Sequence, residues 1–434
     1  MPVPPLSPSK PLLSRTVESR RNWLLPALLA GLGPLVYAAP LGAVPMLLAI
    51  GLGTAVVAGG AGWRSALGGG AVFVPLFVWM LLSALWALDA GAALSLALRL
   101  AGMFAAGFLV VGWFGRLSLD RLGPCLPAMA LGFIAAGAVV VIDLETLNGG
   151  IVRLLHAKQA PTRDIALLYG RGATVQAMLI LPLLLGLWRS GARRLAVLQL
   201  VVGVLAILVT PSLSARMALA TALVVGAAVF TLPFLRFTLL GALALGVLAL
   251  PFILPYRPDP TTACWLANSK ASALHRLYIW DFAGERIAER PVAGWGLDAS
   301  RRMPGGDTKV TIRRCDTALQ PYGPLRVDGT VMPLHPHNAI LQVWLELGGI
   351  GAILGFGAVA AILGRAFAAP AWRGRRACAG FAGAAFGSLS VASVSFGIWQ
   401  EWFLAALFIT AAASVLSARQ DETPANAEAA QLRT

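Results

Sequence analysis

Long apolar runs recur along almost the whole chain, and they restrict its possible folds more than any other feature. A helix of roughly 20 apolar residues crosses about 30 Å of hydrocarbon. Hydrophobic residues make up 58% of the 434 positions and charged residues only 12%. We therefore expect an all-α polytopic membrane protein with about twelve transmembrane helices rather than a soluble domain. The expected spans are residues 23–38, 40–59, 71–88, 100–115, 124–142, 172–188, 195–210, 217–235, 237–255, 339–364, 378–397 and 402–417.

The basic residues gather in the connections between these runs. The formal net charge of +15 would suggest a nucleic-acid partner for a soluble protein. Arginines that flank membrane helices instead set their orientation, with the basic connections on the inner side. We therefore predict that both termini and every even-numbered connection are cytoplasmic, without a nucleic-acid partner. Those connections carry Arg64; Arg116 and Arg121; Arg189, Arg193 and Arg194; Arg236; and Arg365, Arg373, Arg375 and Arg376.

The predicted spans divide the chain into five parts: an N-terminal tail (1–22), nine spans (23–255), a large outer loop (256–338), three more spans (339–417) and a C-terminal tail (418–434). The first apolar run ends without a small-residue cleavage site, so we expect the N-terminal tail to be retained. A second outer segment covers residues 143–171. Within the large loop, an apolar periodicity predicts an amphipathic helix from about Ser272 to Arg290, ended by Pro291 and lying on the membrane surface.

Two of the four cysteines, Cys264 and Cys315, lie in the large outer loop. In an oxidising compartment they can form a disulfide, and the alternative is two separate thiols. We predict the disulfide.

Two histidines stand at the start of the tenth predicted span, in the stretch LHPHNAIL. Asn338 is a good N-cap, and the positive end of the helix suits an anion such as a phosphate. An imidazole beside that charge is biased toward its neutral form, so His337 is a candidate general base. The alternative is an interfacial histidine bonded to a loop carbonyl. His335 could join a metal site, but no carboxylate or cysteine stands at ligand spacing nearby, so we predict no metal.

Three arginines are candidates for binding an anion. Arg216, in PSLSAR, stands at the outer mouth between two spans, where it either clamps a diphosphate or extends to lipid headgroups. Arg276 lies on the predicted amphipathic helix, where its alternative is a solvated or acid-paired surface charge. Arg171, just before the sixth span, is a weaker candidate.

These residues together resemble a known family. His337-Asn338, nine further residues and Gly348-Gly349-Ile350-Gly351 are similar to the His-[Asn/Ser/Gln]-x9-Gly-x-x-[Gly/Thr/Tyr] pattern of bacterial O-antigen ligases. SLSAR, ending at Arg216, is similar to the family's outer-mouth motif. HRLYIW with Arg276, followed by RPVAGWG, is similar to its Arg-x-x-x-Trp and Pro-x-x-Gly-x-Gly motifs. The motifs occur in the expected order over residues 212–351.

The resemblance implies a metal-independent glycosyltransferase of the GT-C type, without a cofactor, in the bacterial inner membrane. Such an enzyme transfers a glycan from undecaprenyl diphosphate to a sugar of lipid A-core on the periplasmic face, in lipopolysaccharide biosynthesis. The roles it implies are general base for His337, orientation for Asn338, and binding of the diphosphate for Arg216 and Arg276. Departure of the diphosphate builds negative charge that cationic side chains can stabilise, and direct displacement inverts the anomeric centre.

Three alternatives remain open. An O-antigen polymerase of the same superfamily uses the same donor but extends another lipid-linked glycan. A protein O-glycosyltransferase usually carries a soluble domain after its last helix, and the sequence offers only about seventeen residues there. A twelve-helix secondary transporter should show ionisable residues within its spans and an internal repeat, whereas here the charges stand at the membrane edges.

Overall fold

Each of the twelve predicted segments coincides with or overlaps a helix in the computed structural model, which describes residues 12–58, 63–156, 162–315 and 325–419. Nine helices among the described residues are long and apolar enough to cross a membrane. Two apolar segments, Trp23–Ala38 and Gly69–Ser83, are shorter. The multi-pass, largely helical architecture is therefore confirmed, while the number of twelve spans stays a prediction.

The helices and strands have the following bounds. The first ten helices are α1 (Leu12–Ala38), α2 (Ala43–Ala58), α3 (Trp63–Gly68), α4 (Val74–Ser83), α5 (Ala90–Phe114), α6 (Leu119–Leu122), α7 (Cys125–Glu145), α8 (Gly150–His156), α9 (Thr162–Ala166) and α10 (Gly170–Arg189). They are followed by α11 (Arg193–Val209), α12 (Leu213–Thr231), α13 (Leu235–Ile253), α14 (Pro260–Glu289), the strands β1 (Lys309–Arg313) and β2 (Leu325–Thr330), and α15 (Ala339–Ala368), α16 (Arg375–Val394) and α17 (Glu401–Arg419). Short 3₁₀ turns lie at Pro40–Gly42, Gly69–Phe73, Leu167–Tyr169, Ala299–Arg302 and Pro370–Trp372.

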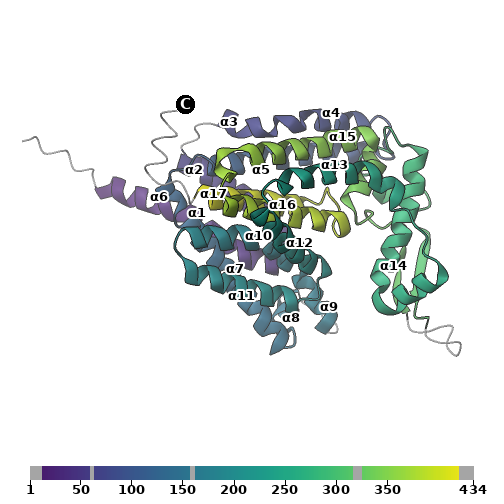
Figure 1. Cartoon of the computed structure of the whole chain (residues 1–434), viewed down its shortest axis with the longest axis horizontal. Helices are drawn as coiled ribbons and strands as arrows, with labels where there is room; N and C mark the ends of the chain where they lie inside the picture. The colour runs from purple at the N-terminus through teal and green to yellow at the C-terminus, as the bar shows by residue number, and fades with distance from the viewer. Residues whose placement is uncertain (1–11, 59–62, 157–161, 316–324, 420–434) are drawn as a thin grey trace, which may run out of the picture.

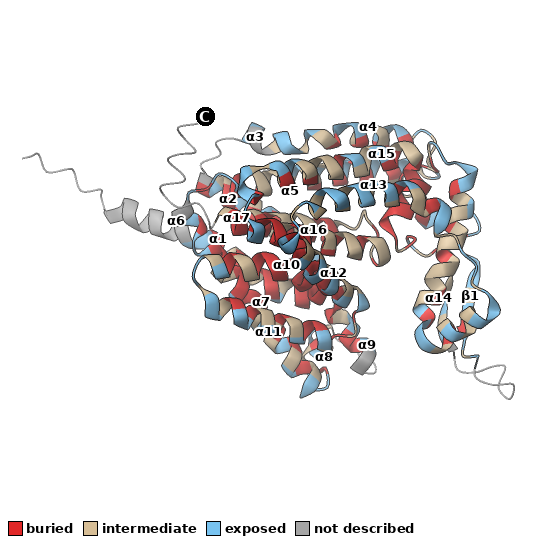
Figure 2. Cartoon of the chain, in the orientation of Figure 1, coloured by how far each residue is buried: buried red, intermediate tan, exposed pale blue. Residues whose placement is uncertain are grey.

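Helix α10 forms the centre of the bundle and α13 part of its outer surface (Figures 1 and 2). In the most apolar stretch of the span that contains α10, 83% of the residues are buried, whereas in that of α13 only 11% of the residues are buried. Both helices are nevertheless strongly apolar. A helix that is apolar on all sides yet exposed requires an apolar solvent, which a lipid bilayer provides.

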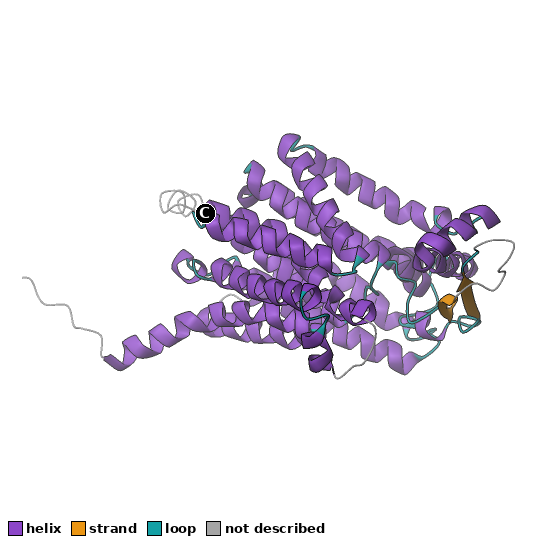
Figure 3. Ribbon diagram, turned by 90° about the horizontal axis from the view of Figure 1, so that it is seen from below, coloured by secondary structure: helices purple, strands orange, loops and turns teal. Residues whose placement is uncertain are grey.

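The arginine-rich connections meet at one end of the bundle. Arg121, which follows α5, donates to the carbonyl of Val57 at the end of α2. Arg189, at the end of α10, donates to the Ala418 carbonyl at 3.0 Å, and Arg419 donates to the Phe114 carbonyl at 3.3 Å. All of these residues belong to even-numbered connections or to the C-terminal end of the last helix. If the helices cross the membrane in alternating directions, these parts of the chain lie on the same side of the membrane. The lobe built around α14 lies at the opposite end (Figures 1 and 3).

The large outer loop folds into a lobe that contains a helix and a hairpin. Its helix α14 begins at Pro260 and is interrupted at Lys270, where the backbone is extended (φ −148°, ψ 67°). The second half matches the predicted amphipathic helix, and it ends before Pro291 as expected. The antiparallel hairpin β1–β2, with Ile312 opposite Val327, was not predicted. It packs on α14 through a small apolar cluster that includes Ala267, Leu274 and Ile312.

The first helix is longer than the predicted span, and the predicted disulfide is not formed. Helix α1 already begins at Leu12, so half of the predicted tail 1–22 is helical; residues 1–11 and 420–434 lie outside the described residues. Cys264 and Cys315 lie close together, but no disulfide joins them in this structure. The Cys264 thiol instead lies 3.8 Å from the Cys315 carbonyl oxygen, and the Cys315 amide donates to the Asn268 side chain of α14 at 2.9 Å.

Candidate active site

The stretch His335–Asn338 forms a tight turn that leads into α15. His337 has a positive φ of 54°, a left-handed conformation that costs a residue other than glycine about 1–3 kcal/mol. Asn338 is the N-cap of α15, and its Oδ1 accepts hydrogen bonds from the Ile340 and Leu341 amides at 3.0 and 3.1 Å. The cap holds the helix start in place. The strained residue before it is the one predicted to carry the chemistry.

The His337 ring is held in one tautomer. Its Nδ1 lies 2.6 Å from the Ser395 carbonyl oxygen, and since a carbonyl can only accept, Nδ1 carries the proton and donates. In the neutral ring Nε2 therefore keeps its lone pair. Burial lowers the pKa of His337, the bond to Ser395 opposes this effect, and the positive charge of Arg276 lowers the pKa further. The ring is thus a neutral base near pH 7.

His335 packs edge-on against His337, with 4.4 Å between the ring centroids. Its Nδ1 accepts a hydrogen bond from the His337 amide at 3.1 Å, and its Nε2 lies 3.1 Å from the side-chain amide of Gln400. Burial, together with the charges of neighbouring cations, lowers the pKa of His335 to about 3. His335 therefore stays neutral and supports the turn. Among the described residues, no group of three or more His, Cys, Asp or Glu is placed to hold a metal ion.

A large polar cavity, cavity A, opens between α14, the start of α12 and the segment after α16. Its volume is about 910 Å³. The walls carry four cationic residues, Arg171, Lys270, Arg276 and Arg326, against one carboxylate, Asp164. Such an excess of positive charge in a concave site attracts an anion.

Arg276 is the predicted arginine that the structure brings to this site. It lines cavity A, and its Nε is buried without a hydrogen-bond partner among the described residues. Burial lowers the pKa of Arg276. One turn further along α14, Trp280 donates to the Pro336 carbonyl at 2.9 Å and so fixes α14 against the histidine turn. Arg276 and His337 are therefore held together by the contact between these two elements.

Arg216 is not among the residues that line cavity A, and its role in binding the diphosphate stays a prediction. Ser214 and Met217 of the same helix line the cavity, and Arg216 lies about 100° around α12 from Met217 and about 160° from Ser214. The guanidinium donates to the carbonyls of Leu208 and Thr210, at 2.7 and 3.2 Å. The last carbonyls of α11 lack helical partners and attract a cation, which explains this position.

Arg171, the weaker candidate of the three arginines, lines cavity A. It stands in the first turn of α10, and its guanidinium carbon lies 5.4 Å from the centre of the Trp402 ring, within reach of a cation–π contact. The sequence contained only one indication that Arg171 lines an anion-binding cavity, namely its position at the start of a long apolar helix.

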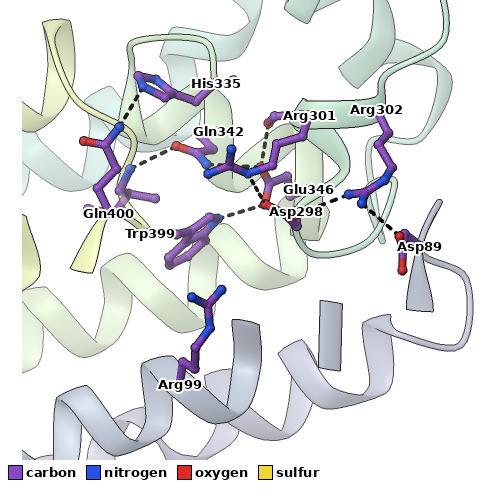
Figure 4. A network of polar contacts seen from close by, with 12 residues as sticks. Asp89, Arg99, Asp298, Arg301, Arg302, His335, Gln342, Glu346, Trp399 and Gln400 are labelled. Atoms are coloured by element: carbon purple, nitrogen blue, oxygen red, sulfur yellow. Dashed lines mark hydrogen bonds and ion pairs between the residues drawn. The ribbon is translucent and has the colours of Figure 1, made fainter. Parts of the chain in front are cut away.

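A buried carboxylate, Glu346, was missed by the sequence analysis. It accepts hydrogen bonds from the Ser300 hydroxyl (2.5 Å), the Asp298 amide (2.8 Å), the Gln342 side chain (3.1 Å) and the Trp399 indole (2.8 Å) (Figure 4). The network ties two loops to α15. An acidic residue inside an apolar run was the available signal, because a carboxylate is expensive there unless it is fully bonded.

The two glycine motifs of the resemblance pack against each other. Gly348 interrupts α15 with φ 66°, and a Cβ there would lie 2.2 Å from the Val292 carbonyl oxygen. Gly294, with φ 69°, likewise approaches the main chain of Glu346. Main-chain hydrogen bonds join the two segments, including one from the Gly349 amide to the Pro291 carbonyl at 2.8 Å. Glycine is needed because only it permits both the positive φ and the close approach.

Part of the chain is similar to known proteins. Residues 164–356 match the family model described as O-antigen ligase. A candidate polysaccharide ligase of Rickettsia conorii is 41% identical over 97 residues, which cover 22% of this chain and 21% of that protein. Similar proteins from Rickettsia prowazekii (38% over 97 residues; 22% and 21%) and Rickettsia bellii (41% over 83 residues; 19% and 18%) carry the same description. The chain thus spans about a fifth of the length of these relatives. The histidine turn and both glycine motifs lie within the stretch that is similar to the O-antigen ligase family.

Proposed function

We propose that the protein is an O-antigen ligase that transfers a glycan from undecaprenyl diphosphate to a sugar of lipid A-core. The observation that carries the proposal is the position of His337, a neutral base of defined tautomer, beside the cationic cavity A with Arg276. The family supports a glycosyltransferase-like enzyme and argues against a transporter. We place the protein in the bacterial inner membrane with both termini cytoplasmic and the site periplasmic, as the arginine-rich connections indicate.

In the proposed reaction, an acceptor hydroxyl attacks the anomeric carbon of the donor glycan. Its proton passes to Nε2 of His337 while the bond from the anomeric carbon to the diphosphate oxygen breaks. Undecaprenyl diphosphate leaves with the electron pair, and Arg276 and the other cations of cavity A stabilise its added charge. The anomeric centre is inverted, and no metal takes part. Arg216 contributes to binding only after its guanidinium leaves the α11 carbonyls.

The test is a reconstituted reaction in EDTA with undecaprenyl-diphosphate glycan and lipid A-core. We expect glycosylated lipid A-core from the wild type, and a loss of about 10²- to 10⁴-fold in rate for His337→Ala. His156→Ala, on α8, is the control histidine and should retain the wild-type rate. Longer glycans on the polyprenyl carrier, with lipid A-core unchanged, would instead identify a polymerase.

A further inference from the structure

A second polar cavity, cavity B, lies beside the histidine turn, and the proposed reaction has not used it. Its volume is about 510 Å³, and His335, Arg99, Arg301, Trp399, Gln400 and Trp402 are among its lining residues. Arg171 lines both cavities. Trp280, which lines cavity A, donates a hydrogen bond to the Pro336 carbonyl, whereas the preceding residue, His335, lines cavity B. The histidine turn is therefore part of the partition between them.

The chemistry of cavity B differs from that of cavity A. Three arginines are offset by two carboxylates: Arg99 pairs with Glu401 at 3.0 Å, and Arg301 pairs with Asp298 at 2.8 Å. The amide side chains of Gln342 and Gln400 and the indole rings of Trp399 and Trp402 complete the walls. Figure 4 labels both amides and Trp399. Paired charges and amides supply both donors and acceptors, which suits hydroxyl groups, and the indoles add flat apolar faces. Cavity B therefore fits a sugar better than it fits a free diphosphate.

Cavity B adjoins an apolar cavity, cavity C, inside the bundle. Cavity C has a volume of about 290 Å³ between α5, α15, α16 and α17, and Phe104, Val343 and Leu407 are among its lining residues. Trp399 lines both cavities, and its indole is held by the bond to Glu346. A molecule with a sugar headgroup in cavity B can thus place an apolar chain in cavity C.

We propose that cavities B and C together bind the acceptor glycolipid, with its sugars in B and one acyl chain in C. This inference rests on the proposed function, in which inversion requires the acceptor hydroxyl to approach from the side opposite the diphosphate. The histidine turn lies between the two cavities, so a donor in cavity A and an acceptor in cavity B would approach each other from opposite sides. The donor's polyprenyl tail, several times longer than an acyl chain, is too large for cavity C, and its diphosphate belongs in the cationic cavity A.

The test uses two glycines of α15 as a matched pair. Gly355 lines cavity C, and a Cβ there would meet Leu76 at an ordinary 3.5 Å, so Gly355→Leu adds a side chain that starts at the cavity wall without backbone strain. Gly357 faces open space, with nothing within 4 Å of a Cβ, so Gly357→Leu is the control. Binding of lipid A-core, deacylated core oligosaccharide and undecaprenyl diphosphate to each purified protein is measured without turnover.

We expect Gly355→Leu to weaken the binding of lipid A-core by about tenfold, because the leucine takes space from a few methylenes of the chain. Its binding of the deacylated oligosaccharide and of undecaprenyl diphosphate should match that of Gly357→Leu and the wild type. Weaker binding of undecaprenyl diphosphate would instead place the donor's tail in cavity C and overturn the proposal. Unchanged or uniformly weakened binding would also overturn it.

The polar half of the site has its own measurement. Arg99→Gln should weaken the binding of the deacylated core oligosaccharide, whereas Arg64→Gln, at the opposite end of the bundle, should not. If both variants bound the oligosaccharide equally well, the proposal that cavity B binds the acceptor sugars would be wrong. A wild type that binds lipid A-core but transfers no glycan to it would contradict the proposed function and leave the acceptor site standing, so the two failures are distinguishable.

Discussion

Nδ1 of His337 and the main-chain carbonyl of Ser395 are joined by a hydrogen bond of 2.6 Å across 58 positions of sequence. The bond leaves Nε2 as the basic nitrogen and ties the histidine turn to the segment between α16 and α17. Two further bonds hold that segment to α15, from the Ile398 amide to Gln342 and from the Trp399 indole to Glu346. The His337 side chain is therefore positioned by contacts that involve both α15 and the end of α16.

The pH dependence of the reaction should reflect His337. Its pKa lies below the usual value near 6.5 because of burial and the charge of Arg276. A base must be unprotonated, so kcat/KM should be constant above pH 6.5 and should decrease on the acid side, by about tenfold per pH unit below the pKa. Initial rates from pH 4 to 8 measure this. His335→Gln should show the same decrease of kcat/KM at acid pH. A decrease of kcat/KM only at alkaline pH would contradict the role of His337 as a base.

The arginines should differ in their contributions to turnover. Arg276→Gln should lower kcat by about 10²- to 10³-fold, because a half-buried cation that lines cavity A is lost. Arg171→Gln should chiefly raise the donor KM. Arg216→Gln should cost less activity than either, since its guanidinium bonds to α11 carbonyls outside the cavity. Steady-state kinetics with varied donor separates these effects, and an Arg216→Gln loss equal to that of Arg276→Gln would show that Arg216 enters the site during turnover.

Glu346→Gln should destabilise the fold by about 3 kcal/mol. The carboxylate accepts four hydrogen bonds, and an amide nitrogen in place of one oxygen would face donors at two of them. Thermal unfolding in detergent measures the loss. Glu289→Gln is the matched control, because its carboxylate forms an exposed pair with Arg286 and should change stability by less than about 0.5 kcal/mol. Similar unfolding temperatures for both variants would show that the network is not needed for stability.

His335 should make stability depend on pH. Its pKa is about 3 in the folded protein and near 6.5 when unfolded, so between these values the unfolded state binds more protons. Stability from this residue is complete above pH 6.5 and is lost as the pH falls toward 3, at up to about 1.4 kcal/mol per pH unit. Unfolding temperatures at pH 7, 6 and 5 should fall less in His335→Gln than in the wild type. Parallel curves would contradict this assignment.

The sequence alone determined the class of the fold. The length of each apolar run and the position of the arginines beside it are local properties, and they decide directly whether a segment is stable in a bilayer. The helix before Pro291, the N-cap Asn338 and the candidacy of His337 and Arg276 were likewise readable, since each depends on a few neighbouring residues.

Only the tertiary structure decided which cations meet at the site. Arg171 and Arg216 look alike in sequence, but the rotation of α12 turns Arg216 toward α11, while the first turn of α10 places Arg171 between two cavities. The bonds of His337 to Ser395 and of Glu346 to Trp399 join segments more than fifty residues apart. No local pattern encodes such contacts, because they depend on how the helices pack.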